Sequence, residues 1–194
     1  MSDNTSPYEI LVGSGQSWYA PVGTAFPGLA DAPTAPWVSM GDMDGGLTIT
    51  AGQTVVQHRT DQHTGPIKAT RSEENLAIET NLAESTLENI ALVLNSAVTD
   101  TPAGVGTIGT RTMNLHRGPE VDQYAFLFRA YSPYGPWEAQ YCLPVGYFDG
   151  DASFAYKKDT KVVILARFVA LEDPDAATED ERFGYLVAQD AVAT

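Results

Sequence analysis

The residues of this sequence whose types best suit chemistry are His58, Asp61 and His63, which lie close together in a polar segment. Two imidazoles and a carboxylate are ligands that zinc commonly uses. Their spacing fits no usual zinc motif, however, and no cysteine lies near them. We therefore interpret both histidines as facing solvent or an interface, and the sequence predicts no metal site.

Three other patterns begin like known sites but are incomplete. Asp42-Met43-Asp44-Gly45 starts like a calcium loop but lacks the later ligands, including the distal glutamate, so a turn is the better interpretation. Cys142 and His116 could act as nucleophile and base, yet Cys142 lies in an apolar stretch, where a thiol behaves as a small hydrophobe. Gly13-Ser14-Gly15 lacks the third glycine and the following helix of a dinucleotide-binding fingerprint. Without a nucleophile–base pair or a metal cluster, we expect neither an enzyme nor a cofactor.

Charge and composition narrow the classes of partner. The chain has 194 residues, with 11 Lys and Arg against 25 Asp and Glu, which gives a net charge of −14. A free nucleic-acid binder needs a basic face, so this balance argues against one. Cys142 is the single cysteine, which excludes an internal disulfide. The polar start lacks the regions of a secretory signal and the apolar runs are too short to span a bilayer, so we expect folding in a cytoplasm and no membrane.

Alternating apolar and polar residues predict a mainly β chain. Residues 37–41 and 46–50 are expected to form strands that the acidic-glycine turn at 42–46 joins into a hairpin. Residues 75–82 are expected to form a third strand, and residues 85–95 a helix whose capping box is Ser85 with Glu88. Later strands are predicted at residues 110–116, 122–132, 137–147, 161–171 and 183–187.

Two features of this plan indicate contacts with other molecules. Residues 57–72 make a long polar loop between well-patterned strands, and loops of this length are usually functional or disordered. The strands at 122–132 and 161–171 are apolar on both faces. Each therefore needs a second cover, from the helix or from another subunit.

Residues 1–36 differ from the rest because they are rich in proline and glycine. We expect them to form an extended N-terminal arm with short strands at residues 8–12 and 17–20. Residues 37–194 are then the β-sandwich domain. Such an arm often lies on a partner, and a free terminus is an equally good interpretation.

The order of elements over residues 37–95 resembles the tail tube proteins, also called major tail proteins, of long-tailed bacteriophages. The likeness includes a W-x-x-x-G strand, an acidic-glycine turn with its following strand, and an E-S-T-x-E-N helix start. The residues that carry it are Trp37 to Gly41, Asp44 to Thr50, the polar loop with Gln62, Glu74 to Glu79, and Leu82 to Ile90. These motifs are structural rather than catalytic, and they cover about a third of the chain.

The resemblance implies a mainly β fold, either a β-sandwich or a barrel-like tail tube fold, with one flanking α-helix and a long β-hairpin loop. It implies a structural virion protein whose copies assemble into hexameric rings, stacked into a hollow tube through which phage DNA passes without specific binding. The further partners expected are the tape measure, tail terminator and baseplate proteins. The expected location is the virion tail, after assembly in the host cytoplasm.

Carried onto this chain, the loop at residues 57–72 becomes the hairpin extension that contacts the next ring. The candidate inter-ring contact residues are Gln57, His58, Arg59, Asp61, Gln62, His63, Lys68 and Arg71. An acidic ring surface would attract the basic residues of this loop, which sets register more than affinity. From strand alternation, the possible lumen-facing residues are Thr48, Thr50, Asn75, Ala77, Glu79 and Asn81. The net charge of −14 suits a lumen in which DNA slides without sticking.

Two alternatives remain at the level of sequence. The chain could be a related ring-forming virion protein, such as a tail terminator or a tube initiator. It could also be a carbohydrate-binding β-sandwich module, in which Trp18, Tyr131, Tyr134 and Trp137 would stack on sugar rings. Aromatic residues next to proline and glycine, as at residues 134–137, more often pack a turn.

Overall fold

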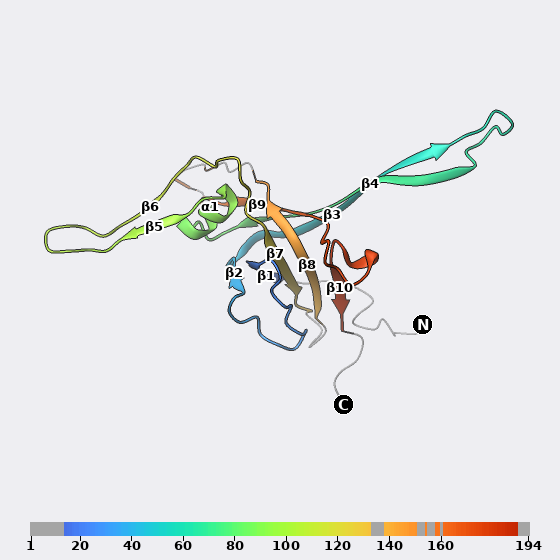
Figure 1. Ribbon diagram of the computed structural model, residues 1–194. Helices are drawn as coiled ribbons and strands as arrows, with labels where there is room; N and C mark the ends of the chain where they lie inside the picture. Colours follow the sequence, from blue (N-terminus) through green and yellow to red (C-terminus); the bar gives the residue numbers. More distant parts are fainter. Residues whose placement is uncertain (1–13, 133–137, 151–153, 155–157, 160, 190–194) are drawn as a thin grey trace.

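One antiparallel sheet makes the body of the protein (Figure 1). The computed structural model describes residues 14–132, 138–150, 154, 158–159 and 161–189. The eight-stranded sheet has the order β2-β1-β7-β8-β9-β4-β3, and β10 also pairs with β8. The strands of this sheet are β1 (Gly15–Pro21), β2 (Val38–Ser39), β3 (Met43–His58), β4 (Lys68–Leu82), β7 (Tyr124–Ala130), β8 (Ala139–Phe148), β9 (Ile164–Ala170) and β10 (Tyr185–Ala188). A separate hairpin consists of β5 (Val98–Thr101) and β6 (Thr110–Met113), and the helical segments are α1 (Leu87–Leu94) and the 3₁₀ helix η1 (Glu179–Glu181).

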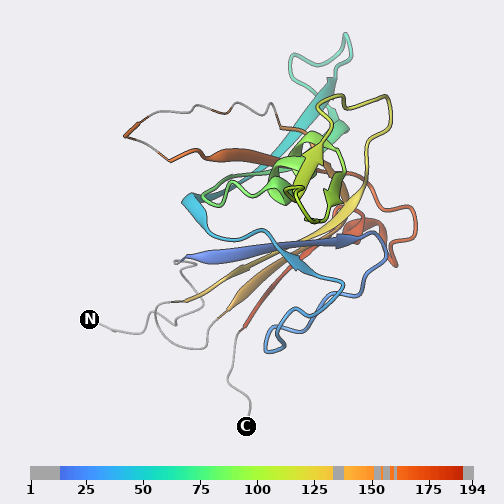
Figure 2. The same cartoon turned by 90° about the vertical axis from the view of Figure 1, so that its left-hand side faces the viewer.

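Most of the core lies on one face of β7 and β8. Phe126, Leu143, Phe168 and Ile78 pack together there and come from four different strands. Residues 146–148, at the end of β8, pair with β9. From there β9, β4 and the base of β3 lie across this face of β7 and β8 (Figure 2). The helix α1 packs against the same cluster. The predicted mainly β fold with one flanking helix is therefore confirmed.

The opposite face of β7 is covered by the chain's own proline-rich segment. Leu127 and Cys142 pack with Trp18, and the rings of Phe26 and Trp37 lie 5.2 Å apart at the same cluster. β7 is thus covered on both faces, but the predicted source of the second cover, the helix or another subunit, is wrong. The second cover comes from residues 22–37, a source that the sequence did not suggest.

A buried hydrogen-bond network, which we call the Arg129 clasp, fastens residues 22–37 to the sheet. Arg129 donates to the carbonyl groups of Asp31 and Gly28 at 2.9 Å each, and its Nη2 also donates to Gln140 Oε1 at 2.7 Å. Gln140 in turn donates to the Pro27 carbonyl at 2.8 Å. Arg129 is only 5% exposed and Gln140 only 3%, so these bonds satisfy polar groups that water does not reach.

The described part of the expected N-terminal arm is thus built into the body. β1 pairs with β7 along its whole length, and the segment after it is held by the Arg129 clasp. In the part of the chain that the structure describes, the residues before and after the expected boundary at residue 36 therefore belong to the same folded unit. Residues 1–13, with the strand expected at 8–12, lie outside the described residues.

The predicted hairpin between residues 37–41 and 46–50 is wrong. β2 pairs with β1, whereas β3 pairs with β4. Gly45 and Gly46 do take positive φ values of 84° and 82°, but they form an irregularity inside β3, where the register shifts between Met43 and Leu47. Glycines that permit a turn also permit a bulge, and the local sequence does not distinguish the two.

The start of α1 also differs by one residue from the prediction. Thr86 is the N-cap, and its hydroxyl accepts from the Asn89 amide at 3.2 Å. Ser85 instead donates to the Val162 carbonyl at 2.7 Å, and Glu88 pairs with Arg111. Either Ser or Thr can cap a helix, so a tertiary contact decided between them.

The Arg129 clasp leads to a stability prediction. Arg129→Ala removes the side-chain donor to the carbonyl groups of residues 28 and 31 and to Gln140 Oε1, so we expect the free energy of unfolding to fall by roughly 3 kcal/mol. Denaturant unfolding measures this change. Arg182→Ala removes exposed ion pairs only and should cost less than about 1 kcal/mol. An equal loss in the two variants would contradict a structural role for the clasp.

Candidate functional site

The β3–β4 hairpin extends far beyond the sheet that carries it (Figure 1). The two strands stay paired out to His58 and Lys68, so the connecting loop is residues 59–67. Every residue from Gln53 to Asn75 is exposed except Gly65, which is half-buried. The prediction of a polar loop over residues 57–72 is therefore wrong in extent, because much of that segment is strand.

Contacts within this hairpin hold its two strands together. Arg71 of β4 donates to Gln53 of β3 at 2.8 Å, and it also pairs with Glu74 of its own strand at 2.9 Å. His58 Nε2 and Thr70 Oγ1 share a hydrogen bond of 2.8 Å across the strands. These contacts are exposed, so each adds little to stability. A two-stranded ribbon alone in water is marginal at best, and both of its edges are open to pairing.

The structure places the predicted inter-ring residues at the end of this hairpin. Arg59, Asp61, Gln62 and His63 lie in the terminal loop, and Gln57, His58, Lys68 and Arg71 lie in the strands beside it. All eight are exposed. Arg71 is already paired with Glu74, so among the described residues the basic side chains left without an ion pair at this end are Arg59 and Lys68.

The predicted lumen-facing residues share one face of β3 and β4. Directly paired residues of antiparallel strands point to the same side, and here Thr48 pairs with Glu79 and Thr50 with Ala77. Asn75 and Asn81 follow the same alternation on β4. Thr48, Thr50, Asn75, Glu79 and Asn81 are exposed, whereas Ala77 is buried. The structure therefore brings the six residues to one face but leaves Ala77 covered.

An ion-pair chain crosses that face. Arg167 of β9 pairs with Glu79 at 2.9 Å and with Asp149 at 3.1 Å. Leu165, which pairs with Asn81, is 39% exposed on the same side. β9 is thus covered on one side only, and its outer side together with β3 and β4 makes a mixed polar and apolar surface.

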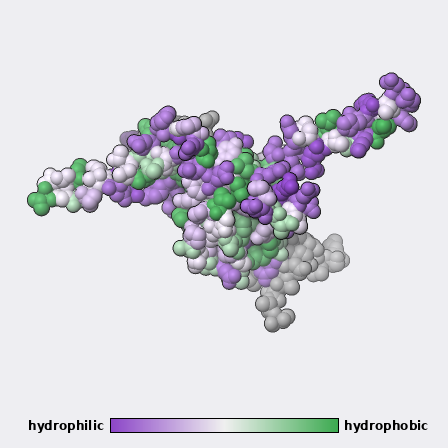
Figure 3. All heavy atoms as spheres, in the orientation of Figure 1, coloured by the Kyte–Doolittle hydropathy of each residue, from purple (hydrophilic) through white to green (hydrophobic). Residues whose placement is uncertain are grey.

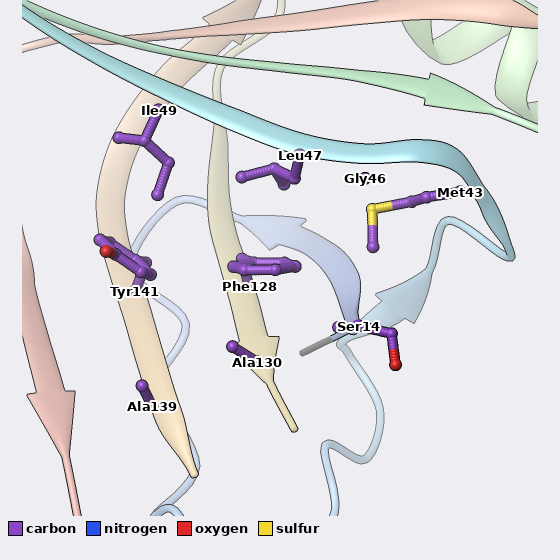
Figure 4. Close-up of a pocket in the computed structure, with 10 residues that line it drawn as sticks. Ser14, Met43, Gly46, Leu47, Ile49, Phe128, Ala130, Ala139 and Tyr141 are labelled. Carbon is purple, nitrogen blue, oxygen red and sulfur yellow. The ribbon is translucent and has the colours of Figure 1, made fainter. Parts of the chain in front are cut away.

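An apolar groove opens between β3 and the pair β7–β8. Its volume is about 320 Å³. Figure 4 shows Leu47 and Ile49 of β3 above Phe128 and Tyr141, with Met43 at one end. The remaining lining residues are Ser14, Gly15, Gly46, Ala130 and Ala139, so no charged side chain lines it.

A second projecting hairpin was missed from the sequence. Residues 99–109 are small and glycine-rich, which is typical of a loop. In the structure β5 and β6 pair from Val98 and Met113 to Thr101 and Thr110, and they carry the residues between them outward (Figure 1). Val105 and Ile108 were the available signal, because large apolar residues are uncommon in a simple polar turn.

The residues first considered for chemistry do not meet in a site. His58, Asp61 and His63 are exposed, and no group of metal-ligating residues occurs in the described parts of the chain. Asp44 pairs with Lys161 at 3.2 Å. Cys142 is fully buried in β8, and burial raises the pKa of its thiol.

The proposed sugar-stacking residues are not assembled into a platform. Trp18 is 7% exposed and belongs to the core, so it cannot stack on a sugar. Tyr131 is 38% exposed. Tyr134 and Trp137 lie outside the described residues.

Comparison with known proteins gives no family for the chain. No protein-family model matches the sequence, and no curated protein matches it. Within the described residues, no helix is long and apolar enough to cross a membrane. The likeness to tail tube proteins therefore depends on the order and character of the elements alone.

The environment of Cys142 leads to a chemical prediction. Because the thiol is buried and its raised pKa lowers the fraction of reactive thiolate at neutral pH, we expect the folded protein to resist a thiol reagent. The unfolded protein should react at once and in full, as a colorimetric thiol assay measures. Rapid labelling without unfolding would contradict the buried position.

Proposed function

We propose that this protein is a structural subunit that assembles with copies of itself into stacked rings, forming the hollow tail tube of a long-tailed bacteriophage. DNA would pass through the lumen, and tape measure, terminator and baseplate proteins would meet the tube at its ends and interior. The order of strands and helix over residues 37–95 supports this proposal, although the acidic-glycine segment forms an irregularity inside β3 and not the turn of the likeness. Hexameric rings and a place in the virion tail are carried over from the resemblance.

The observation that carries the proposal is the β3–β4 hairpin. Its outer part is a regular two-stranded ribbon that is exposed on all sides from Gln53 to Asn75 apart from Gly65. Such a ribbon stabilises nothing in its own subunit, and its open strand edges invite pairing with another chain. Val55, Val56 and Ile67 are also exposed on it, at 47%, 43% and 55%. A surface that receives the ribbon on another copy would bury these groups.

Charge supports contact between copies through this arm. The end of the hairpin presents two basic residues, Arg59 and Lys68, against one acidic residue, Asp61, while the chain as a whole carries a net charge of −14. Opposite charge accelerates encounter and selects orientation more than it adds affinity. The segment 172–181 is rich in acidic residues and supplies one surface of the required sign.

Electron microscopy of the purified protein tests the proposal. We expect long hollow filaments as the concentration rises. Closed single rings that never stack would favour a tail terminator or a tube initiator instead. A protein that remains monomeric at every concentration would contradict self-assembly.

Shortening the hairpin tests its role. We propose replacing residues 57–69 with an Asn-Gly turn that joins Val56 and Thr70, which pair directly. Because the removed part packs on nothing in its own subunit, the free energy of unfolding should change by less than about 0.5 kcal/mol. Filaments should be lost, as electron microscopy and sedimentation measure.

The control for this variant is Val22→Ser, which alters an exposed valine away from the hairpin. It should form filaments as the unaltered protein does. Normal filaments from the shortened variant would show that the hairpin is not the assembly contact.

A further inference from the structure

The tip of the β5–β6 hairpin is the most exposed apolar feature of the described chain. Val105 and Ile108 are 108% and 80% exposed, the two highest values among the large apolar residues there. Figure 3 shows a hydrophobic end on this arm, opposite the β3–β4 hairpin. Single apolar residues on a surface are ordinary, but an apolar end on a projecting arm marks an interaction site.

The turn at this tip has a definite geometry. Gly104 and Thr107 exchange backbone hydrogen bonds of 3.0 and 3.1 Å, so Val105 and Gly106 are the two turn residues. Gly106 takes a φ of 73°, which glycine adopts without strain. Turn positions usually hold glycine, proline, asparagine, aspartate or serine, so the valine meets no requirement of the turn.

The base of the hairpin is fixed to α1. Arg111 of β6 donates to Asp100 at 2.7 Å and pairs with Glu88 of α1. Ser96, just after the helix, donates to the Asn114 carbonyl at 2.7 Å. A hydrogen bond from Arg111 lowers the pKa of Glu88, which favours the charged form that the ion pair requires. The arm therefore presents its tip from a fixed base.

A receiving surface of matching polarity lies elsewhere on the same chain. The groove between β3 and β7–β8 is lined by Leu47, Ile49 and Phe128 among other uncharged residues (Figure 4). Residues 101–110 at the tip are likewise uncharged. In a chain with a net charge of −14, two copies can join these surfaces without removing a charge from water. Tip and groove thus match in both polarity and charge.

We propose that the β5–β6 tip of one copy inserts Val105 and Ile108 into the groove between β3 and β7–β8 of a second copy. The tip points away from its own body, so a copy does not fill its own groove (Figures 1 and 2). Because the two surfaces differ, the contact is heterologous, and its repetition closes into a ring or continues as a filament. The inference rests on the proposed self-assembly and adds a contact distinct from that of the β3–β4 hairpin.

Disulfide trapping tests this contact directly. One batch of protein carries Val105→Cys and a second, with a larger affinity tag, carries Ile49→Cys. After the batches are mixed under assembly conditions and oxidised with copper phenanthroline, we expect a covalent heterodimer on a non-reducing gel. The native Cys142 is buried and should not take part.

The matched cysteine control is Val55→Cys, on the same strand but on the exposed ribbon. Mixed with the Val105→Cys protein, it should give at most a trace of heterodimer. A stronger cross-link to residue 55 than to residue 49 would place the tip against the neighbour's ribbon and overturn the groove assignment.

A polar tip tests the energetic role of the same contact. Burial of two aliphatic side chains lowers the free energy of the contact. The double variant Val105→Ser with Ile108→Ser should therefore raise the critical concentration for assembly at least about tenfold. The control variant Val22→Ser with Val38→Ser changes two exposed valines away from the β5–β6 tip and the groove, and it should leave the critical concentration unchanged.

The outcomes separate this inference from the proposed function. Filaments that form normally from the serine-tip variant, with no cross-link between residues 105 and 49, would overturn the inference and leave the tube proposal intact. Failure of the unaltered protein to assemble at all would overturn both.

Discussion

The constraint on which the structure depends is that its central strands are apolar on both faces. Phe126 on one side of β7 and Leu127 on the other cannot both be buried by a single layer. The chain solves this by folding β9, β4 and α1 across one face and its proline-rich segment across the other. That segment packs Phe26 and Trp37 into the cluster it covers, and the Arg129 clasp supplies the directional bonds that fix it.

With both faces of the centre covered, the body needs no partner for its core. What remains uncovered are two arms, which leave the body in opposite directions (Figure 1). The outer part of each arm is exposed, and ordering it costs conformational entropy. Arms of this kind are stable features of a molecule when another surface receives them, which is the physical basis for proposing a subunit rather than a solitary domain.

Periodicity predicted most of the strands because the rule of alternate burial is local. Partner choice is not local, so the hairpin expected around Gly45 and Gly46 was wrong, although both glycines take the positive φ that a turn would need. The cap moved from Ser85 to Thr86 because Ser85 donates to the carbonyl of Val162, which is far along the chain and lies just before β9. Arg129 gave no sequence signal, since its partners are backbone carbonyl groups about a hundred residues away.

Charge explains why arms, rather than flat faces, would carry the proposed contacts. Two bodies that each carry −14 repel, but exposed charges scarcely interact beyond a Debye length of about 8 Å in physiological salt. At roughly 3.3 Å per residue, the strand from Gln53 to His58 alone reaches farther than this. In the proposed assembly, the β3–β4 hairpin could thus hold a contact while the bodies stay apart, and Arg59 and Lys68 would meet acidic surfaces. The tip of the β5–β6 hairpin would add no repulsion to the proposed contact, because residues 101–110 have no charged side chain.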